Sequence, residues 1–290
     1  MAGRPGEGEA LRPEPSRGDG MSACIVCGVD GSHQADKAAA VAARLARDLR
    51  SRAVLVHVQE RPSRLPRPGR GRRRRRMLKA TASGCCFPGD TQFRLKTGDP
   101  TSELLDAARE EDAELLVVST GGLGTASPVL LGGTATALMC DSPCPVVVVP
   151  TRSEPPLDAE AMRNVVCAIE GRPGDAAVLG LAGDLATRLG GDLHAVSDSD
   201  AGIDPRELGS DAALHVVHAP ADDAVKRVAD RVRAGLVVVG APNDGDPSLG
   251  LNVPLAIALA ADGEIPLVVL TGAAKLQIGS GHYELAAGAT

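Results

Sequence analysis

Aromatic residues are almost absent from this chain. Its 290 residues include no tryptophan, one tyrosine and two phenylalanines, yet 43% of them are hydrophobic. The core must therefore consist of valine, leucine, isoleucine and alanine, which suits a parallel α/β sheet whose strands are buried on both faces. The same shortage nearly excludes recognition of nucleic-acid bases by stacking on aromatic side chains.

Long apolar runs and ordered cysteine spacings are missing as well. No run approaches the roughly 20 apolar residues that a membrane helix needs, so we expect no membrane contact. Residues 1–20 are rich in glycine, proline and charge and lack the apolar core of a signal peptide. They are predicted to be a disordered tail, with Met21 as an alternative start. The seven cysteines show no disulfide framework, which predicts reduced thiols and a cytoplasmic location.

Catalytic and metal-binding motifs are also lacking. The chain has no P-loop, no Ser/His/Asp or Cys/His arrangement typical of a nucleophile, and no His/Glu cluster typical of a metal site. We therefore expect no catalytic residue and no metal ligand. Cys24 and Cys27 have the spacing of a redox pair, but residues three apart on a strand point to opposite faces. Cys140 and Cys144 are interpreted as buried thiols, with a regulatory disulfide as the alternative.

What the chain does contain is a strand–loop–helix–strand pattern near its middle. The apolar run Leu115–Val118 predicts a buried strand, and a glycine cluster follows at 119–124. The pair Gly132-Gly133 opens a helical pattern, and Val146–Val149 predicts a further strand. Free N–H groups at a glycine-lined helix start favour an anion, so this pattern is typical of a phosphate site in an open α/β sheet.

Three more predicted strands precede this pattern. They lie at 24–29, at 53–58 and from Gln92, and the first two flank a helix whose apolar residues fall on one face. Ser32 is the expected N-cap of that helix, and Asp99 is the expected N-cap of the next one. This strand–helix–strand order predicts a right-handed βαβ unit.

The whole pattern occurs twice. Residues 164–171 repeat the pattern of 24–31, and the second copy again has five predicted strands, the last at Ile265–Leu270. Such a repeat predicts an α/β fold of two tandem Rossmann-like domains, each a five-stranded, mainly parallel sheet flanked by helices. The predicted layout is a tail (1–20), domain 1 (21–151), a linker (152–162), domain 2 (163–272) and a second tail (273–290).

An arginine-rich insert interrupts domain 1 at residues 61–76. It combines nine arginines with proline and glycine, and only a short helix is expected within 77–90. The run Arg72–Arg76 is interpreted as a solvated, disordered charge block, whereas the order of the insert as a whole stays open. Nucleic acid is not expected as a partner. The run Arg72–Arg76 is the only candidate for such contact, which would be made to phosphates without sequence preference.

Three motifs of domain 1 carry a resemblance to a known family. They are Val29–Ser32 after the first strand, His57-Val58 at the end of the second, and the glycine stretch. On these motifs the chain resembles the universal stress protein family over residues 24–150, and it resembles that family loosely over 164–270. The resemblance implies two domains similar to the adenine nucleotide alpha hydrolases.

The glycine stretch follows the family's nucleotide-binding pattern with two departures. Nucleotide-binding members show a glycine, two residues, a glycine, nine residues, and then Gly-Ser or Gly-Thr. Gly122 and Gly132 stand at the second and third glycine positions. Ser119 replaces the first glycine, and Gly133 replaces the final serine or threonine.

The resemblance implies a nucleotide site in domain 1 that takes ATP, alone or with Mg²⁺. The region of Asp30 would meet adenine and ribose, the backbone of Val58 would meet adenine, and the glycine stretch would line the ribose and phosphates. The implied nucleotide-binding residues are Val29, Asp30, Val58, Val118, Ser119, Gly122, Gly132, Gly133 and Thr134.

The implied function is that of an ATP-binding stress-response regulator, not an enzyme, which acts with an unidentified regulatory protein. Two alternatives stay open: a nucleotide-free scaffold, which the two departures favour, and an enzyme that hydrolyses ATP slowly. Domain 2 has Arg172 in place of Ser32 and lacks the glycine set, so we expect it to bind no nucleotide. The resemblance also implies that Val146–Val149 and Ile265–Leu270 pair within the chain as a pseudo-dimer, with a homodimer as a further option.

Overall fold

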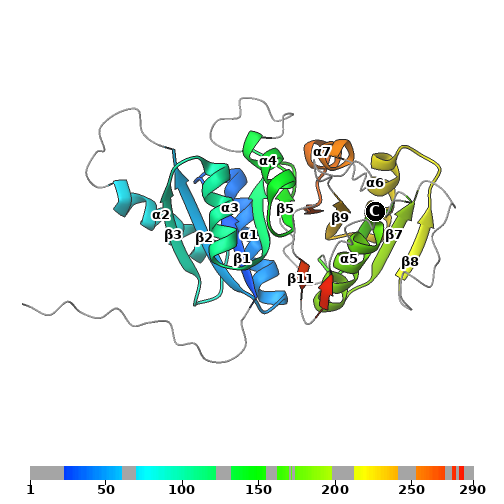
Figure 1. Ribbon diagram of the computed structural model, residues 1–290, viewed down its shortest axis with the longest axis horizontal. Helices are drawn as coiled ribbons and strands as arrows, with labels where there is room; N and C mark the ends of the chain where they lie inside the picture. The colour runs from blue at the N-terminus through cyan, green and yellow to red at the C-terminus, as the bar shows by residue number, and fades with distance from the viewer. Residues whose placement is uncertain are drawn as a thin grey trace, which may run out of the picture.

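The described part of the chain forms a ten-stranded sheet covered by helices, together with a small two-stranded sheet (Figure 1). This computed structural model describes residues 23–60, 70–121, 132–154, 162–169, 171, 174–197, 212–240, 253–271, 276–278 and 281–283. The predicted tail 1–20, much of the predicted linker and the predicted site residue Gly122 lie outside the described residues.

Each half of the chain contributes five strands in the same spatial order. The first half supplies β1 (Cys24–Gly28), β2 (Arg52–Gln59), β3 (Gln92–Thr97), β4 (Ala113–Ser119) and β5 (Val146–Val149). The second half supplies β6 (Val165–Ile169), β7 (Leu193–Ser197), β8 (Ala212–Val216), β9 (Leu236–Gly240) and β10 (Leu267–Leu270). The sheet order is β3-β2-β1-β4-β5-β10-β9-β6-β7-β8, and the pairs within each half are parallel. The predicted fold class is therefore confirmed, whereas the exact domain bounds stay predictions.

Two layers of helices cover the sheet. One face carries α1 (His33–Asp48), α2 (Arg70–Gly84) and α5 (Asp175–Leu189). The other face carries α3 (Pro100–Glu110), α4 (Gly133–Asp141), α6 (Ala221–Val232) and α7 (Val253–Asp262). Among the described helices, none is both long and apolar enough to cross a membrane.

The cysteines of β1 show how its side chains alternate between these layers. Cys24 packs in the core under α3 and α4, and Cys27 packs in the core under α1, as their spacing predicts. Burial raises the pKa of the Cys24 thiol to about 12 and also raises the pKa of the Cys27 thiol. Both thiols therefore stay protonated at neutral pH. They lie on opposite faces of the strand, so they cannot act together as a redox pair.

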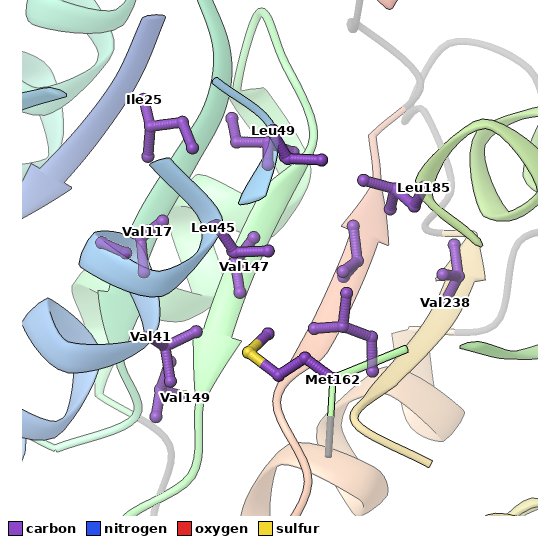
Figure 2. Packing of buried hydrophobic residues seen from close by; sticks show 14 of the residues in the cluster. Ile25, Val41, Leu45, Leu49, Val117, Val147, Val149, Met162, Leu185 and Val238 are labelled. Atoms are coloured by element: carbon purple, nitrogen blue, oxygen red, sulfur yellow. The ribbon is translucent and has the colours of Figure 1, made fainter. Parts of the chain in front are cut away.

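The two halves join through their last strands, as the resemblance implies. β5 and β10 pair antiparallel, with Val148 opposite Leu267 and Val147 opposite Val268. Figure 2 shows α1 packed on β5 beside this seam, with Met162, which lies between β5 and β6 in the chain, extended toward it. Met162 is fully buried, and each apolar side chain of this size stabilises the fold by about 1.5–3 kcal/mol when removed from water.

A buried ion pair also bridges the two halves. Arg188 of α5 donates to the Glu114 carboxylate at 2.8 Å and to the Leu49 carbonyl oxygen at 3.1 Å. Ser51 Oγ donates a further hydrogen bond to Glu114, whose side chain is 3% exposed. The carboxylate is therefore satisfied by donors from both halves of the chain.

Two sequence-based expectations need correction. The run Arg72–Arg76 is not a disordered block, because it forms the first turns of α2, a helix of 15 residues. The helix is held by fully buried Leu78 and by a hydrogen bond of 3.2 Å from Thr81 Oγ1 to Asp36. In addition, β11 (Leu276–Ile278) and β12 (Gly281–Tyr283) form a hairpin in the predicted tail. Three-residue strands leave too little alternation in the sequence to be recognised.

Candidate functional site

The strand order of the first half reverses between β1 and β4. β1 leads to α1 on one face of the sheet, whereas β4 leads to α4 on the other face. Register places Cys27 opposite Val117, so the segments after both strands start side by side at the carboxyl edge of the sheet. In open α/β sheets this switch in strand order is where ligands bind.

The backbone after β1 is fixed by β2. The Val29 N–H group donates to the Val56 carbonyl oxygen at 2.9 Å. His57 Nδ1 lies 2.8 Å from the Val29 carbonyl oxygen, which can only accept, so Nδ1 carries the proton and donates. Because His57 is buried and committed to this bond, it positions the first loop rather than facing solvent. Val58, the next residue along β2, is half-buried and packs against the core.

The turn from β1 into α1 is organised by Asp30. Its Oδ1 atom accepts a hydrogen bond of 2.8 Å from the Ser32 N–H group. Ser32 in turn caps α1, because its Oγ atom accepts from the Ala35 N–H group at 3.1 Å. Between them Gly31 has a φ of +86°, a conformation that side-chain-bearing residues rarely adopt. A Cβ atom at Gly31 would also lie 2.6 Å from Met77 Sδ of α2.

The segment after β4 is closed by backbone hydrogen bonds. Val118 is buried and Ser119 is half-buried, and Ser119 Oγ donates to the Gly121 carbonyl oxygen. Thr120 then donates from its N–H group to Val149 at 3.0 Å and accepts from the Gly132 N–H group at 2.9 Å. Gly132 is thereby held beside the end of β4, although the residues between 121 and 132 lie outside the described ranges.

The first turn of α4 points bare backbone groups at this edge. Gly132 is the N-cap residue and provides no side-chain hydrogen bond. Gly133 is exposed, and a Cβ atom built on it would meet nothing within 4 Å. The first N–H groups of a helix have no partner inside the helix, and the helix dipole makes that end favourable for an anion. Thr134, half-buried at the next position, follows in the same turn.

Eight of the nine predicted site residues are therefore described. Val29, Val58, Val118 and Ser119 lie at or just beyond strand ends on the same edge of the sheet, Asp30 follows β1, and Gly132, Gly133 and Thr134 begin α4. Sequence reasoning missed Thr120, which ties β4 to both β5 and α4, and Met77, which packs against the Asp30 turn. Neither residue carries a motif, since its role comes from a tertiary contact. Within the described ranges, no group of three or more His, Cys, Asp or Glu side chains is placed to hold a metal ion.

Comparisons with known proteins agree with this architecture. Residues 21–150 match the model of the Universal stress protein family. A universal stress protein of Thermus aquaticus is 34% identical over 136 residues, which cover 44% of this chain and 99% of that protein. A universal stress protein of Mycobacterium tuberculosis is 31% identical over 137 residues, and the matched region spans 46% of that protein's length.

Solved structures extend the likeness in fold to both halves. A universal stress protein from Archaeoglobus fulgidus aligns with a TM-score of 0.65 over 86% of this chain and 98% of that chain, at 15% identity. A second structure, a putative universal stress protein from Pseudomonas aeruginosa, gives a TM-score of 0.55 over 86% of this chain. At such identities the likeness concerns the fold alone. The fold, the family match and the Thermus relative together place this chain in the universal stress protein family.

Proposed function

We propose that this protein is an ATP-binding stress-response regulator with a single nucleotide site, which lies in the first half of the chain. The observation that carries the proposal is the uncapped start of α4 beside the switch in strand order between β1 and β4. Exposed N–H groups at a helix start suit the phosphates of a nucleotide. No side chain at Gly132 or Gly133 stands in the way of their approach.

The remaining residues have roles that follow from their chemistry. The Asp30 carboxylate accepts hydrogen bonds and suits the ribose hydroxyl groups, while the backbone of Val29 and Val58 suits the edge of adenine. Ser119 and Thr134 offer hydroxyl groups to the ribose and phosphates. Any Mg²⁺ would arrive with the phosphates of ATP, which supply oxygen ligands of the kind that it prefers.

Regulation is proposed to be non-enzymatic: occupancy of the site would change which surface is offered to a protein partner. The nucleotide-free scaffold remains the alternative, and one observation favours it. Ser119 Oγ is already bonded to the Gly121 carbonyl oxygen, where a glycine would leave space. Slow ATP hydrolysis is the further alternative, and it requires measured turnover above the uncatalysed background.

Calorimetric titration of ATP into the full chain tests the proposal, with Gly133→Pro as the diagnostic variant. Proline is favoured at the first position of a helix, and Gly132 has the extended ψ of 142° that a residue before proline prefers. The variant should therefore fold while losing one N–H donor. A hydrogen bond to a charged group contributes about 1.5–3 kcal/mol, so we expect ATP affinity to fall about tenfold or more.

Gly133→Ala is the matched control, because it keeps the N–H group and adds a Cβ atom into open space. It should bind ATP like the wild type, and Gly133→Ser, which restores the hydroxyl group of the family pattern, should bind more tightly. Saturation at two sites per chain would contradict the assignment to the first half. No heat at millimolar ATP in the wild type would favour the scaffold.

A further inference from the structure

Helix α2 presents the arginine run on a rigid support. Figure 1 shows this helix at the outer edge of the first half, beside β3. Its inner side is anchored, because Leu78 is fully buried and Arg74 donates to Gln59 Oε1. Just beyond its end, Cys85 Sγ lies 3.6 Å from the Asp36 carbonyl oxygen. The outer side of the same helix is therefore held in one orientation relative to the sheet.

The outer side of α2 is a continuous basic face. Arg72, Arg75, Arg76 and Lys79 follow one another at the i, i+3, i+4, i+7 spacing that places residues on one side of a helix. All four are exposed, and exposed Arg73 flanks them. At a rise of 1.5 Å per residue, the face runs for about 10 Å along the helix axis.

Within the described residues, the charges on this face are not paired with carboxylates. In the described part of the chain no ion pair joins Arg72–Arg76 or Lys79 to an acidic residue, although cations elsewhere such as Lys96 and Arg52 are paired. The first turn of α2 contains no acidic residue, and cations there oppose the helix dipole. Like charges three and four residues apart destabilise a helix further. The arrangement thus costs stability until an anion neutralises it.

The composition of the face selects among anionic partners. Guanidinium groups make paired hydrogen bonds with phosphate oxygens, which favours a phosphate-bearing partner. A membrane surface fits poorly, because an interfacial helix needs its apolar side for lipid and α2 uses that side to pack on the protein. Single-stranded nucleic acid also fits poorly, since neighbouring Phe87 and Phe93 are half-buried against the core and leave no stacking platform.

We infer that the face formed by Arg72, Arg73, Arg75, Arg76 and Lys79 binds the phosphate backbone of double-stranded nucleic acid without sequence preference. Duplex carries one charge per about 1.7 Å of its axis, so a face of about 10 Å spans on the order of six phosphates. Charge complementarity and regular spacing favour this occupant over an acidic protein. The inference does not depend on nucleotide binding at the strand ends.

Fluorescence anisotropy of the full chain with labelled duplexes tests this inference. The probes are 20-base-pair DNA and RNA duplexes in two unrelated sequences each, titrated between 50 and 200 mM salt. If four phosphates are neutralised, the logarithm of the affinity should fall with the logarithm of salt at a slope of about −3.6, or about 150-fold across this range. Both sequences should bind alike.

The diagnostic variant replaces Arg72, Arg75, Arg76 and Lys79 with glutamine and should lose most of the salt-dependent affinity. Its matched control replaces four exposed arginines outside the face with glutamine: Arg47, Arg50, Arg227 and Arg233. Each variant removes four positive charges from a chain of formal net charge −6, so bulk electrostatics change equally. The diagnostic variant should unfold at an equal or higher temperature than the wild type, because it removes repulsion within α2.

Several outcomes would overturn the inference. They are no wild-type binding at 50 mM salt, equal loss of affinity in the control variant, a salt slope near zero, and tighter binding to polyglutamate or to anionic vesicles than to duplex. Comparison of the DNA and RNA arms then shows whether either duplex form is preferred. Tighter binding to a single strand of the same sequence would also contradict it.

Discussion

The two halves of the chain share one strand order but begin their helices differently. In the first half, β1 is followed by Gly31 at φ +86° and by Ser32, which caps α1. In the second half, β6 is followed by Gly171 at φ +72°, but the N-cap of α5 is Gly174, which provides no side-chain hydrogen bond. The turn glycine is present twice, whereas the capping hydroxyl group is present once.

The second pair of helix starts differs more strongly. α4 begins at the exposed Gly133, which keeps its N–H group, whereas α7 begins with Val253-Pro254, and proline has no N–H group. Repetition of apolar residues is enough to build the same sheet twice. The donors that a ligand needs come from a few positions at its edge, and those positions are free to differ.

The largest expected effect tests whether the halves are stabilised as one unit. Glu114→Ala removes the buried carboxylate that Arg188 and Ser51 share. Breaking a buried pair by removing one partner costs about 3–5 kcal/mol, and we expect the lower end because the Arg188 side chain is 24% exposed. Urea unfolding followed by circular dichroism measures the loss.

Asp106→Ala is the matched control, since it breaks the exposed pair between Asp106 and Arg109 within α3. Surface pairs contribute about 0–1 kcal/mol, so this change should be nearly silent. If Glu114→Ala were equally silent, the ion pair would contribute nothing to holding the halves together. A second unfolding transition in Glu114→Ala alone would show that the halves had become independent.

A medium effect is expected from alanine at two glycines with a left-handed φ, Gly31 in the first half and Gly190 in the second. Gly31→Ala places an alanine at a left-handed φ, which costs about 1–2 kcal/mol. Its Cβ atom would also lie 2.6 Å from Met77 Sδ, so the Met77 side chain must move. Gly190→Ala at the end of α5 has a similar φ cost of about 1–2 kcal/mol, but its Cβ atom would meet nothing within 4 Å. Thermal unfolding should therefore show the larger loss for Gly31→Ala.

The combination of Gly31→Ala with Met77→Ala sharpens this comparison. Truncation of Met77 removes the sulfur atom, so the double variant should lose less stability than the sum of the single changes. Strict additivity would mean that the two residues do not touch. It would also mean that Met77 of α2 does not support the turn that carries Asp30.

Much of the fold was predictable because it depends on local patterns. Neighbouring residues are enough to predict the strand Val146–Val149 and the helix start at Asp99. The structure has the strand and the N-cap at those positions. Helix α2 was missed because the arginine run has no apolar periodicity of its own. It is helical because Met77, Leu78 and Thr81 further along contact α1 and the core, which the sequence does not display.

The candidate site was predictable in the same uneven way. The positions of Asp30 and Gly132 follow from strand ends and a helix start, which sequence patterns reveal. The contribution of Thr120 does not, because its partners Val149 and Gly132 are far along the chain. Whether Ser119 tolerates a nucleotide depends on the space around one hydroxyl group, and no motif encodes that.

The smallest expected effect concerns the outer edge of the second half. His194 Nδ1 of β7 lies 3.1 Å from His215 Nε2 of β8, and Arg231 of α6 lies 3.1 Å from His215 Nδ1. Arginine only donates, so His215 accepts at Nδ1 and donates from Nε2 to His194. Burial lowers the pKa of both imidazoles, and Arg231 lowers both further, while Asp192 opposes the shift at His194.

This arrangement predicts a loss of stability in mild acid. Because the pKa values are lower in the folded chain than the unfolded value of about 6.5, the unfolded chain takes up protons first as the pH falls through that value. Between pH 7.5 and 5.5 the wild type should lose slightly more thermal stability than His215→Gln, by a difference of under about 1 kcal/mol. His33→Gln, at an exposed histidine of the first half, should match the wild type. Equal acid sensitivity in His215→Gln would mean that the imidazole pair does not titrate on unfolding, and the two halves would then respond alike to pH.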